Sequence, residues 1–525
     1  MKKFQFLIIL FSVILWSSCR KDFDTVTNTG TLEFSADTIF FDTLFTKIKS
    51  STQQLTVYNR TDEDINIPEV YLESGANSKY TLNVDGISTP NNVEENTFTD
   101  ITVLANDSIF VFTELLVDLD TDVTDEDSFY NDKILFNSLN GTQEVYLVSL
   151  INDANFIVQS EDKEIRSFET TTRDDQGEFI AIEGYDLTAD ELTFSNEKAY
   201  VIYGNAIVPS GQTLTIDAGA RIHFHEDSGI IVENGASIQI NGAESPEEDP
   251  NLNQVIIEGD RIAEDFNDLP GQWNFIWIME GSTNNSITNT TIKNSSIGIL
   301  IEGNGAELEP NLTLRNVQIY NSQSAAIQAN ASNIVAENLV VNRNVAAGIN
   351  IEEGGTYDFN HCTIVNTSIS LALGGFSSLT ALSLGNRLQN DSSVSNTDLN
   401  ANFTNCIIVG DSRTEVRFNN DEASEFNFNF TNCLMDISET SNTELNPELD
   451  IENNLFYTDC IFNEDPDFKS TKFNELQIGE ESAANSAAIT TTNNIDIIGS
   501  ERDIDNPDIG AYESIIFEEE EETIE

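Results

Sequence analysis

Three aromatic residues in the middle of the chain are spaced so that they could stack together on a ring-shaped ligand such as a sugar. Trp273, Phe275 and Trp277 recur at every second position, so in an extended strand their rings lie on one side. If the other side, with Ile276 and Ile278, packs into a core, the aromatic side faces outward unless a loop covers it. The spacing therefore predicts a candidate ligand contact, with burial under a covering segment as the alternative.

A second candidate site is a run of alternating aspartates, Asp118, Asp120 and Asp122. Carboxylate oxygens are ligands that Ca²⁺ prefers, and this spacing is typical of the start of a calcium loop. A full EF-hand loop needs Gly at its sixth position and Glu at its twelfth, where this chain has Val123 and Phe129. Calcium binding is one interpretation and an acidic loop between strands is the other. No other cofactor is indicated.

No catalytic residue is singled out. Hydrolysis of a glycosidic bond needs two carboxylates facing one cleft, about 5–9.5 Å apart, and the 90 acidic residues offer many pairs without marking one. His223 and His225 share a strand face with Arg221 and could ligate a metal, yet no third ligand accompanies them. The plainer interpretation is that they are outward residues of a strand.

A repeat in the C-terminal half indicates the elements that must position these residues. Seven segments vary one phrase, and the steps between their first residues are 27, 22, 23, 44, 27 and 27 residues. Such a period in a β-rich chain is typical of a solenoid, because one turn is too small to bury its own apolar face. Asn at the first position suits a left-handed corner and can hydrogen-bond along the stack. The segments begin at Asn289, Asn316, Asn338, His361, Asn405, Asn432 and Asp459.

The second residue of four of these segments is a cysteine. Equivalent positions of neighbouring turns stack about 4.8 Å apart, and a free cysteine behaves as a small buried hydrophobe. The shared position predicts a structural ladder of packed thiols, with disulfides as the alternative for an exported protein. The four residues are Cys362, Cys406, Cys433 and Cys460.

Composition limits the partners. The 525 residues include 90 acidic and 24 basic ones, for a formal net charge of −66. A nucleic-acid partner is excluded by this balance, because phosphate backbones are bound by clustered Lys and Arg. Short β-rich runs separated by turn-prone stretches over residues 31–160 predict an antiparallel sandwich ahead of the repeats.

The N-terminus resembles that of a bacterial lipoprotein. Lys2 and Lys3 precede a short apolar run, and Ser17-Ser18-Cys19 is similar to the lipobox cut by lipoprotein signal peptidase. This resemblance implies that Cys19 becomes a lipidated N-terminus. The following residues 20–24 resemble the tag of Bacteroidetes lipoproteins exposed on the outer face of the outer membrane. We therefore expect a lipid anchor in the outer membrane and a chain that faces the exterior.

The rest of the chain resembles modules of Bacteroidetes surface lipoproteins. Residues 83–86 are similar to immunoglobulin-like domains of the abnormal-spindle and hydin type, and residues 269–273 to a segment of right-handed, pectate-lyase-like parallel β-helices. Residues 508–513 resemble the choice-of-anchor Q terminal segment. The resemblance implies an all-β protein, with an immunoglobulin-like β-sandwich followed by a right-handed single-stranded parallel β-helix (a solenoid).

Together these patterns predict a non-catalytic surface protein whose solenoid binds an extended partner, a polysaccharide or a surface protein, or has an adhesive role. A polysaccharide lyase or glycoside hydrolase on the same scaffold is the alternative. The expected organisation is a signal peptide at 1–18, a tether at 19–30, the sandwich at 31–160, a connector at 161–198, the β-helix with its C-terminal cap at 199–513 and an acidic tail at 514–525.

Overall fold

A computed structural model describes residues 31–90, 96–118, 129–138, 141–173, 179–246, 248–262, 266–305, 309–367, 380–387, 397–412, 415–438, 443 and 446–517. These residues form strands and short 3-10 helices but no α-helix, so the predicted all-β class is confirmed. The chain separates into two compact units, residues 1–153 and 154–525, which are described separately. The 3-10 helices are η1 (Gly75–Asn77), η2 (Ala189–Glu191), η4 (Pro447–Leu449) and η5 (Thr471–Phe473).

The first unit consists of two sheets around one core. Alternation of apolar and polar residues gives the longer strands one buried face; β4, for example, buries Ile65, Ile67, Val70 and Leu72. Apolar residues of both sheets meet in a single cluster. One sheet has the order β1 (Glu33–Phe34), β3 (Gln53–Tyr58), β7 (Ser108–Leu115) and β5 (Tyr80–Val84). The other has the order β2 (Thr38–Phe45), β9 (Gly141–Asn152), β8 (Phe129–Ser138), β4 (Ile65–Leu72) and β6 (Thr97–Val103).

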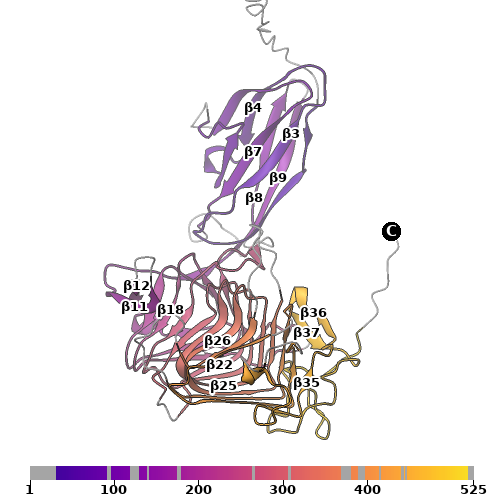
Figure 1. The fold of residues 1–525 in the computed structure, drawn as a ribbon. Coiled ribbons are helices and arrows are strands. Elements are labelled where there is room, and N and C mark those ends of the chain that lie inside the picture. The colour runs from indigo at the N-terminus through magenta and orange to yellow at the C-terminus, as the bar shows by residue number, and fades with distance from the viewer. Residues whose placement is uncertain are drawn as a thin grey trace, which may run out of the picture. The chain divides into compact units, whose positions relative to one another are not determined.

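The second unit is dominated by one large sheet of 26 strands that curls on itself (Figure 1). Its strands up to β22 are β10 (Ala154–Ile157), β11 (Ile165–Arg173), β12 (Phe179–Asp186), β13 (Thr193–Phe194), β14 (Ala199–Ile202), β15 (Asn205–Val208), β16 (Thr213–Asp217), β17 (Arg221–Phe224), β18 (Gly229–Val232), β19 (Ser237–Asn241), β20 (Val255–Gly259), β21 (Ile276–Ile278) and β22 (Asn285–Lys293). The others are β23 (Ile299–Glu302), β24 (Leu312–Tyr320), β25 (Ala325–Asn342), β26 (Ala347–Asn360), β27 (Thr363–Asn366), β28 (Thr380–Gly385), β29 (Leu399–Thr404), β30 (Ile407–Gly410), β31 (Val416–Asn419), β32 (Phe426–Thr431), β33 (Leu434–Met435), β34 (Tyr457–Thr458) and β35 (Ile461–Phe462).

Strands of this sheet pair in parallel with strands one to four places further along the chain. In the first turns every third strand pairs, as in β15 with β18 and β18 with β21. The β11–β12 hairpin is the antiparallel exception among the described pairs. The register repeats from turn to turn, so each position of one turn stacks on the same position of the next. One such inward row is Ile230, Ile276, Ile299, Ile327, Ile349, Leu382 and Val416.

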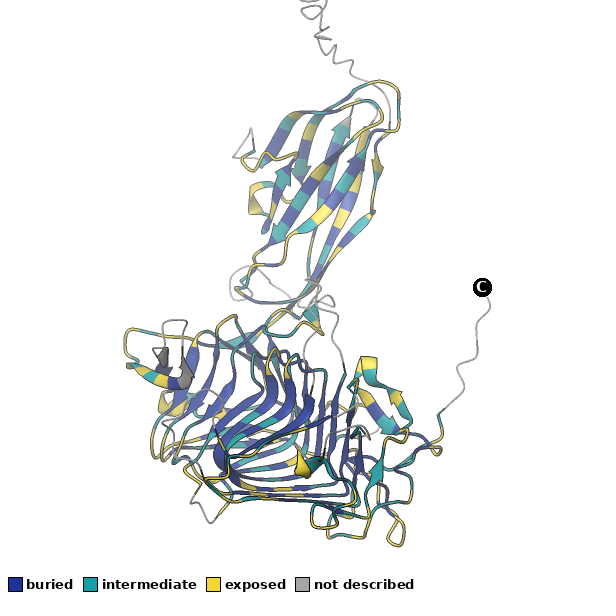
Figure 2. Cartoon of the chain, in the orientation of Figure 1, coloured by how far each residue is buried: buried dark blue, intermediate teal, exposed yellow. Residues whose placement is uncertain are grey.

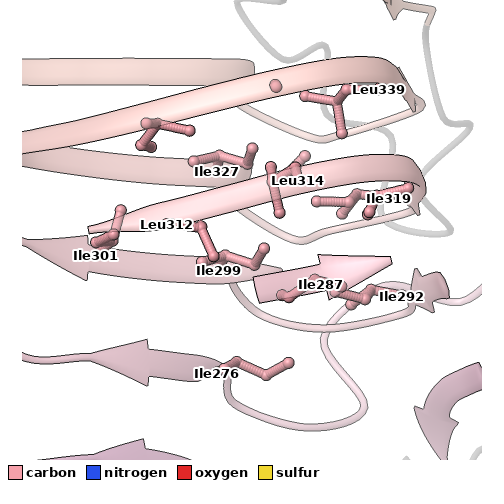
Figure 3. Close-up of a cluster of buried hydrophobic side chains, with 14 of the residues drawn as sticks. Ile276, Ile287, Ile292, Ile299, Ile301, Leu312, Leu314, Ile319, Ile327 and Leu339 are labelled. Atoms are coloured by element: carbon pink, nitrogen blue, oxygen red, sulfur yellow. The ribbon is translucent and has the colours of Figure 1, made fainter. Parts of the chain in front are cut away.

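Inward side chains of successive turns fill the interior of the curled sheet. Figure 3 shows isoleucines and leucines from neighbouring strands meeting there, and Figure 2 shows the corresponding strands as buried. Aromatic rings stack in the same way near the C-terminal end. Phe403 lies between Phe359 and Phe430, with ring centroids 5.0 and 4.9 Å away. Stacking of identical rows makes the core continuous, as the repeat predicts.

The repeated asparagines form the corners between stacked strands. The first residues of all seven segments have φ between 42° and 54°, in the left-handed region that Asn tolerates better than most residues. Their amides also join neighbouring turns. Asn316 Nδ2 donates to Asn289 Oδ1 at 3.1 Å, and Asn338 Nδ2 donates to Asn316 Oδ1 at 2.8 Å.

The C-terminal segment packs along an outer side of the stack. Its residues Ile497, Ile509 and Tyr512 share an apolar cluster with outward residues of the repeats, among them Val340 and Val365. Strands β36 (Phe468–Ser470) and β37 (Glu475–Ile478) belong to the same region. The segment was expected to cap an end. The structure places it on a flank, where outward apolar side chains need cover.

The expected connector, residues 161–198, contains strands of the large sheet. β11 and β12 form a hairpin, and β12 continues in parallel with β15. Charged and apolar residues alternate along both strands, as expected for a strand pair whose apolar side packs on other residues.

Candidate functional site

The candidate site lies on an outward row of the large sheet. The register joins eight outward residues of successive turns into one line. The first four are apolar and the last four are polar, so the chemistry of the row changes halfway along it. In order they are Ile207, Ile231, Trp277, Leu300, Gln328, Asn350, Ser383 and Arg417.

The β11–β12 hairpin covers the apolar half. Phe168 and Ile182 pack against the cluster that contains Trp277, and the Phe168 ring meets the indole edge-on at 6.3 Å. Arg166 holds the hairpin in place because its Nε donates to Asp186 and its Nη1 to Glu233, both at 2.8 Å. The apolar half is therefore closed to solvent.

The aromatic strand is buried, which corresponds to the alternative that a segment covers it. Trp277 and Phe275 lie in the outer cluster under the hairpin. Trp273 lies instead in the interior, stacked on Phe224 with ring centroids 4.5 Å apart. The expectation that all three rings share a face is wrong for Trp273, because strand β21 begins at Ile276 and the alternation does not reach position 273. None of the three presents an open ring face to solvent.

Gln328 and Asn350, the first two residues of the polar half, belong to a hydrogen-bond network. Asn350 Nδ2 donates to Gln328 Oε1 at 2.8 Å and to Glu352 Oε1 at 3.2 Å. Gln328 Nε2 in turn donates to Asn330 Oδ1 at 2.9 Å. A second outward row, two residues further along the strands, contains Glu302, Asn330 and Glu352 in register. Amide and carboxylate groups at strand spacing offer several donors and acceptors to a ligand lying across the turns.

A cavity of 320 Å³ opens where the hairpin meets the polar half. Its floor comes from strands β23, β25 and β26, and its wall comes from β11. The lining residues are Glu169, Thr170, Glu280, Glu302, Gly303, Asn330 and Glu353. We call this cavity the glutamate groove.

Glu302 is the carboxylate of the glutamate groove on which burial and neighbouring charges act together. Burial raises its pKa to about 7, the Trp277 indole N–H opposes this by hydrogen-bonding the carboxylate, and the nearby Glu353 and Glu280 charges raise the pKa further. Burial also raises the pKa of Glu352, against the hydrogen bonds from Asn350 and Gln328. A carboxyl group with a pKa near neutrality can hold or release a proton under physiological conditions.

The other predicted site residues are spread over the chain. Asp118 pairs with Lys47 at 3.6 Å, whereas Asp120 and Asp122 lie outside the described residues. The described part of the chain holds no group of three or more His, Cys, Asp or Glu side chains arranged for a metal ion. His225 Nδ1 lies 2.7 Å from Asp260 Oδ2. Calcium at Asp118 to Asp122 stays a prediction.

The cysteines occupy equivalent inward positions with free thiols. Cys362, Cys406 and Cys433 are buried in the interior, and Cys460 is half-buried at the end of the row. The Cys433 Sγ accepts a hydrogen bond from the Cys406 backbone N–H at 3.4 Å. The predicted lipidation residue, Cys19, lies outside the described residues.

Glu302, Asn330 and Glu352 were not singled out from the sequence. Each is the polar residue that ends a short, mostly apolar stretch of sequence, in residues 298–302, 326–330 and 348–352. Aligning these strands rather than the asparagine phrase would have placed the three residues in one row. The signal was present but lay at a different position of the repeat.

Comparisons with known proteins leave the family open. No family model matches the sequence, and no curated protein matches it. A family 123 glycoside hydrolase from Clostridium perfringens, studied for glycolipid glycan hydrolysis, is 9% identical and aligns over 23% of this chain and 26% of its own length, with a TM-score of 0.15. PapD-like domain 7 of human CEP192, an ASH domain, is 13% identical and aligns over 26% of this chain and all 100% of its own, with a TM-score of 0.15. At these values neither likeness supports a conclusion on fold or function.

Among the described residues, no helix has the length and apolar character required to cross a bilayer.

Proposed function

We propose that this chain is a lipid-anchored protein of the outer membrane surface, built from an immunoglobulin-like sandwich and a right-handed parallel β-helix. The parallel, in-register stacking of short strands supports the β-helix assignment. The two-sheet core of the first unit supports the sandwich. The lipobox-like residues before Cys19 support the anchor and the similarity to Bacteroidetes lipoproteins.

The proposed activity is non-catalytic binding of an extended polysaccharide. The observation that carries this proposal is the polar half of the outward row, where Asn350 donates to Gln328 across neighbouring turns and also to Glu352 of the second outward row. Side chains repeated at strand spacing, about 4.8 Å, can contact successive units of a chain that lies along the stack. The net charge of −66 favours a neutral or cationic polymer over an anionic one.

The binding experiment compares two pairs of amide side chains. One pair lies in the proposed site, and the other lies elsewhere on the large sheet. Gln328→Ala with Asn350→Ala removes the amide contact of the proposed site. Asn400→Ala with Asn427→Ala removes a similar contact, of 3.2 Å, at exposed positions of strands β29 and β32. Titration of the purified protein with neutral and charged glycan oligomers should show weaker binding for the first pair alone. Equal binding by both pairs would overturn the proposed surface. If the wild-type protein binds no glycan, a surface-protein partner or an adhesive role takes the place of polysaccharide binding.

Anchoring has its own test. Cys19→Ala should release the protein from the membrane fraction, and mass spectrometry of the wild-type protein should find acyl chains on Cys19. An unmodified Cys19 in membrane-bound protein would overturn the proposed anchor.

Glycoside hydrolysis is the second candidate function, favoured by one observation. Glu302, with its pKa of about 7, lies near the carboxylates of Glu280 and Glu353, and a protonated acid beside an ionised carboxylate is the arrangement that glycosidases use. Release of reducing ends that is lost in Glu302→Gln would establish this activity and overturn the non-catalytic proposal. The absence of turnover with bound glycan would support binding alone.

A further inference from the structure

The interior of the first unit contains a buried carboxylate with one unsatisfied oxygen atom. Asp132, on β8, is 5% exposed and lies on the same side of the strand as the core residues Ile134 and Phe136. Its Oδ1 accepts from the backbone N–H groups of Lys133 at 2.8 Å and Ser74 at 3.2 Å. Its Oδ2 has no hydrogen-bond partner among the described residues. A buried carboxylate in this state costs free energy unless a positive charge accompanies it.

No basic side chain supplies this charge. Lys133 belongs to the opposite side of β8 and pairs there with Glu144 at 3.1 Å and with Glu73 at 3.9 Å. Within the part of the chain that the structure describes, no ion pair joins Asp132 to a lysine, arginine or histidine. The protein as a whole, with a net charge of −66, attracts small cations from solution. The missing charge is therefore more readily supplied by a dissolved ion than by the chain.

Two hydroxyl groups lie beside the carboxylate. Ser149, on β9, is 1% exposed and pairs with Tyr130, two residues from Asp132 on the same face of the sheet. Its Oγ is also without a hydrogen-bond partner among the described residues. Tyr80, on β5 of the other sheet, donates to the Tyr130 carbonyl at 2.9 Å. Burial raises the pKa of Tyr80, the Ser149 hydroxyl lowers it and the Asp132 charge raises it, so these three groups lie close together.

We propose that this part of the sandwich core binds a small monovalent cation such as sodium. Asp132 Oδ2 is the charged ligand, and the hydroxyl oxygens of Ser149 and Tyr80 are the neutral ligands. Hard cations prefer such oxygen ligands. The site is independent of the proposed polysaccharide surface, which belongs to the second unit.

A divalent ion and a water molecule fit these groups less well. Calcium takes about six to eight oxygen ligands, commonly from several carboxylates, and the described residues hold no group of three or more His, Cys, Asp or Glu side chains arranged for a metal ion. A water molecule can hydrogen-bond to Asp132 and Ser149 but leaves the carboxylate charge uncompensated. One carboxylate among neutral oxygen atoms favours an ion of single charge.

Hydrogen exchange of the full chain tests the site, because an ion that binds only the folded state lowers the population of locally opened states. Exchange is followed by mass spectrometry in about 0.3 M sodium chloride and in N-methylglucamine chloride of equal ionic strength, whose bulky cation does not fit a buried site. Peptides from β8 and β9 should exchange at least about threefold more slowly in sodium, as expected when its concentration is at least about twice the Kd. Peptides from β29 and β32 should exchange equally in both salts.

Three variants locate the ion. Asp132→Asn keeps the shape of the side chain and removes its charge, so the difference between the two salts should disappear. Ser149→Ala removes a neutral ligand and should reduce the difference, and it provides a second variant if Asp132→Asn does not fold. Asp64→Asn is the matched control, because this half-buried carboxylate of the same unit accepts from the backbone N–H group of Ala105 at 2.9 Å. It should keep the full difference.

Each other outcome overturns the proposal in a recognisable way. Equal exchange of β8 and β9 in the two salts, in the wild-type chain, would indicate that water alone lies between Asp132 and Ser149. A sodium effect as large in Asp132→Asn as in wild type would indicate general screening of the acidic surface. Slower exchange in calcium chloride but not in sodium chloride would indicate a divalent ion. None of these results bears on the proposed polysaccharide binding, which is measured with glycans and with residues of the second unit.

Discussion

Trp277 and Glu302 lie on neighbouring strands, and the indole Nε1 donates a hydrogen bond of 3.0 Å to a Glu302 carboxylate oxygen. Trp277 is buried under the β11–β12 hairpin, whereas Glu302 lines the glutamate groove. This bond therefore joins the covered apolar half of the outward row to the second outward row, which contains Glu302. It fixes the Glu302 carboxylate at the edge of the cover, where burial and nearby charges act on it together.

Removal of this hydrogen bond should raise the pKa of Glu302. Trp277→Phe keeps an aromatic ring in the cluster but removes the N–H group that stabilises the ionised carboxylate. We expect a pKa above the wild-type value of about 7, measured by NMR titration of the Glu side chains, with Glu302→Gln to assign the signal. Trp273→Phe is the matched control, because that indole donates to the Lys293 carbonyl at 2.9 Å. An unchanged or lower pKa in Trp277→Phe would contradict the role given to this bond.

Release of the hairpin should expose the covered indole. Arg166→Gln breaks the contacts with Asp186 of β12 and with Glu233, which follows β18. In a background with Trp16 and Trp273 replaced by Phe, acrylamide should quench the fluorescence of Trp277 more strongly in this variant. Arg60→Gln, which removes an exposed ion pair with Glu33 in the first unit, should leave quenching unchanged. Equal quenching in both variants would show that Arg166 does not hold the cover.

His361 should make the second unit sensitive to acid. Burial and then the charge of Arg502 lower its pKa from 6.5 to about 3, and its ring nitrogens face the Gly510 carbonyl and the Asn405 amide. Because the pKa of His361 is lower in the folded chain than in the unfolded chain, the unfolded chain binds the proton first as the pH falls. Stability is therefore present above pH 6.5 and is lost as the pH falls from there to about 3, by up to about 5 kcal/mol.

The substitution that tests this is His361→Asn, because asparagine occupies the same corner in five other segments of the repeat. The variant should unfold at a lower pH than wild type when followed by circular dichroism. The shift should be partial, since burial also lowers the pKa of His223. His225→Asn, at a half-exposed position, should leave the acid transition in place. A His361→Asn transition at the wild-type pH would refute the assignment.

Loss of one ring from the aromatic stack should weaken the fold. Phe403→Ala leaves a cavity between Phe359 and Phe430, and such changes cost about 3–5 kcal/mol of unfolding free energy. Phe473→Ala removes a ring that is 65% exposed and should cost less than about 0.5 kcal/mol. Urea unfolding measures both. Similar losses in the two variants would show that stacking within the interior contributes little.

The repeat made much of the fold predictable. Its asparagines required tight corners, and all seven first residues adopt the left-handed backbone. Its cysteines shared one position, and that position faces the interior. These features are local or periodic, so a single turn of the repeat contains the information for them. The hairpin of residues 165–186 was missed because a short, charged strand pair differs little from a connector in sequence.

The sequence by itself determined the strand period, the corner residues and the inward position of the cysteines, because alternation and turn preference act within a few residues. Only the tertiary structure decided which outward residues remain open to a ligand. Trp277 and Gln328 belong to one outward row, 51 residues apart in the chain. The β11–β12 hairpin covers Trp277 and leaves Gln328 uncovered. The position of the hairpin depends on contacts of Arg166 and Phe168 with distant turns. Exposure is a property of packing between distant segments, which no local pattern records.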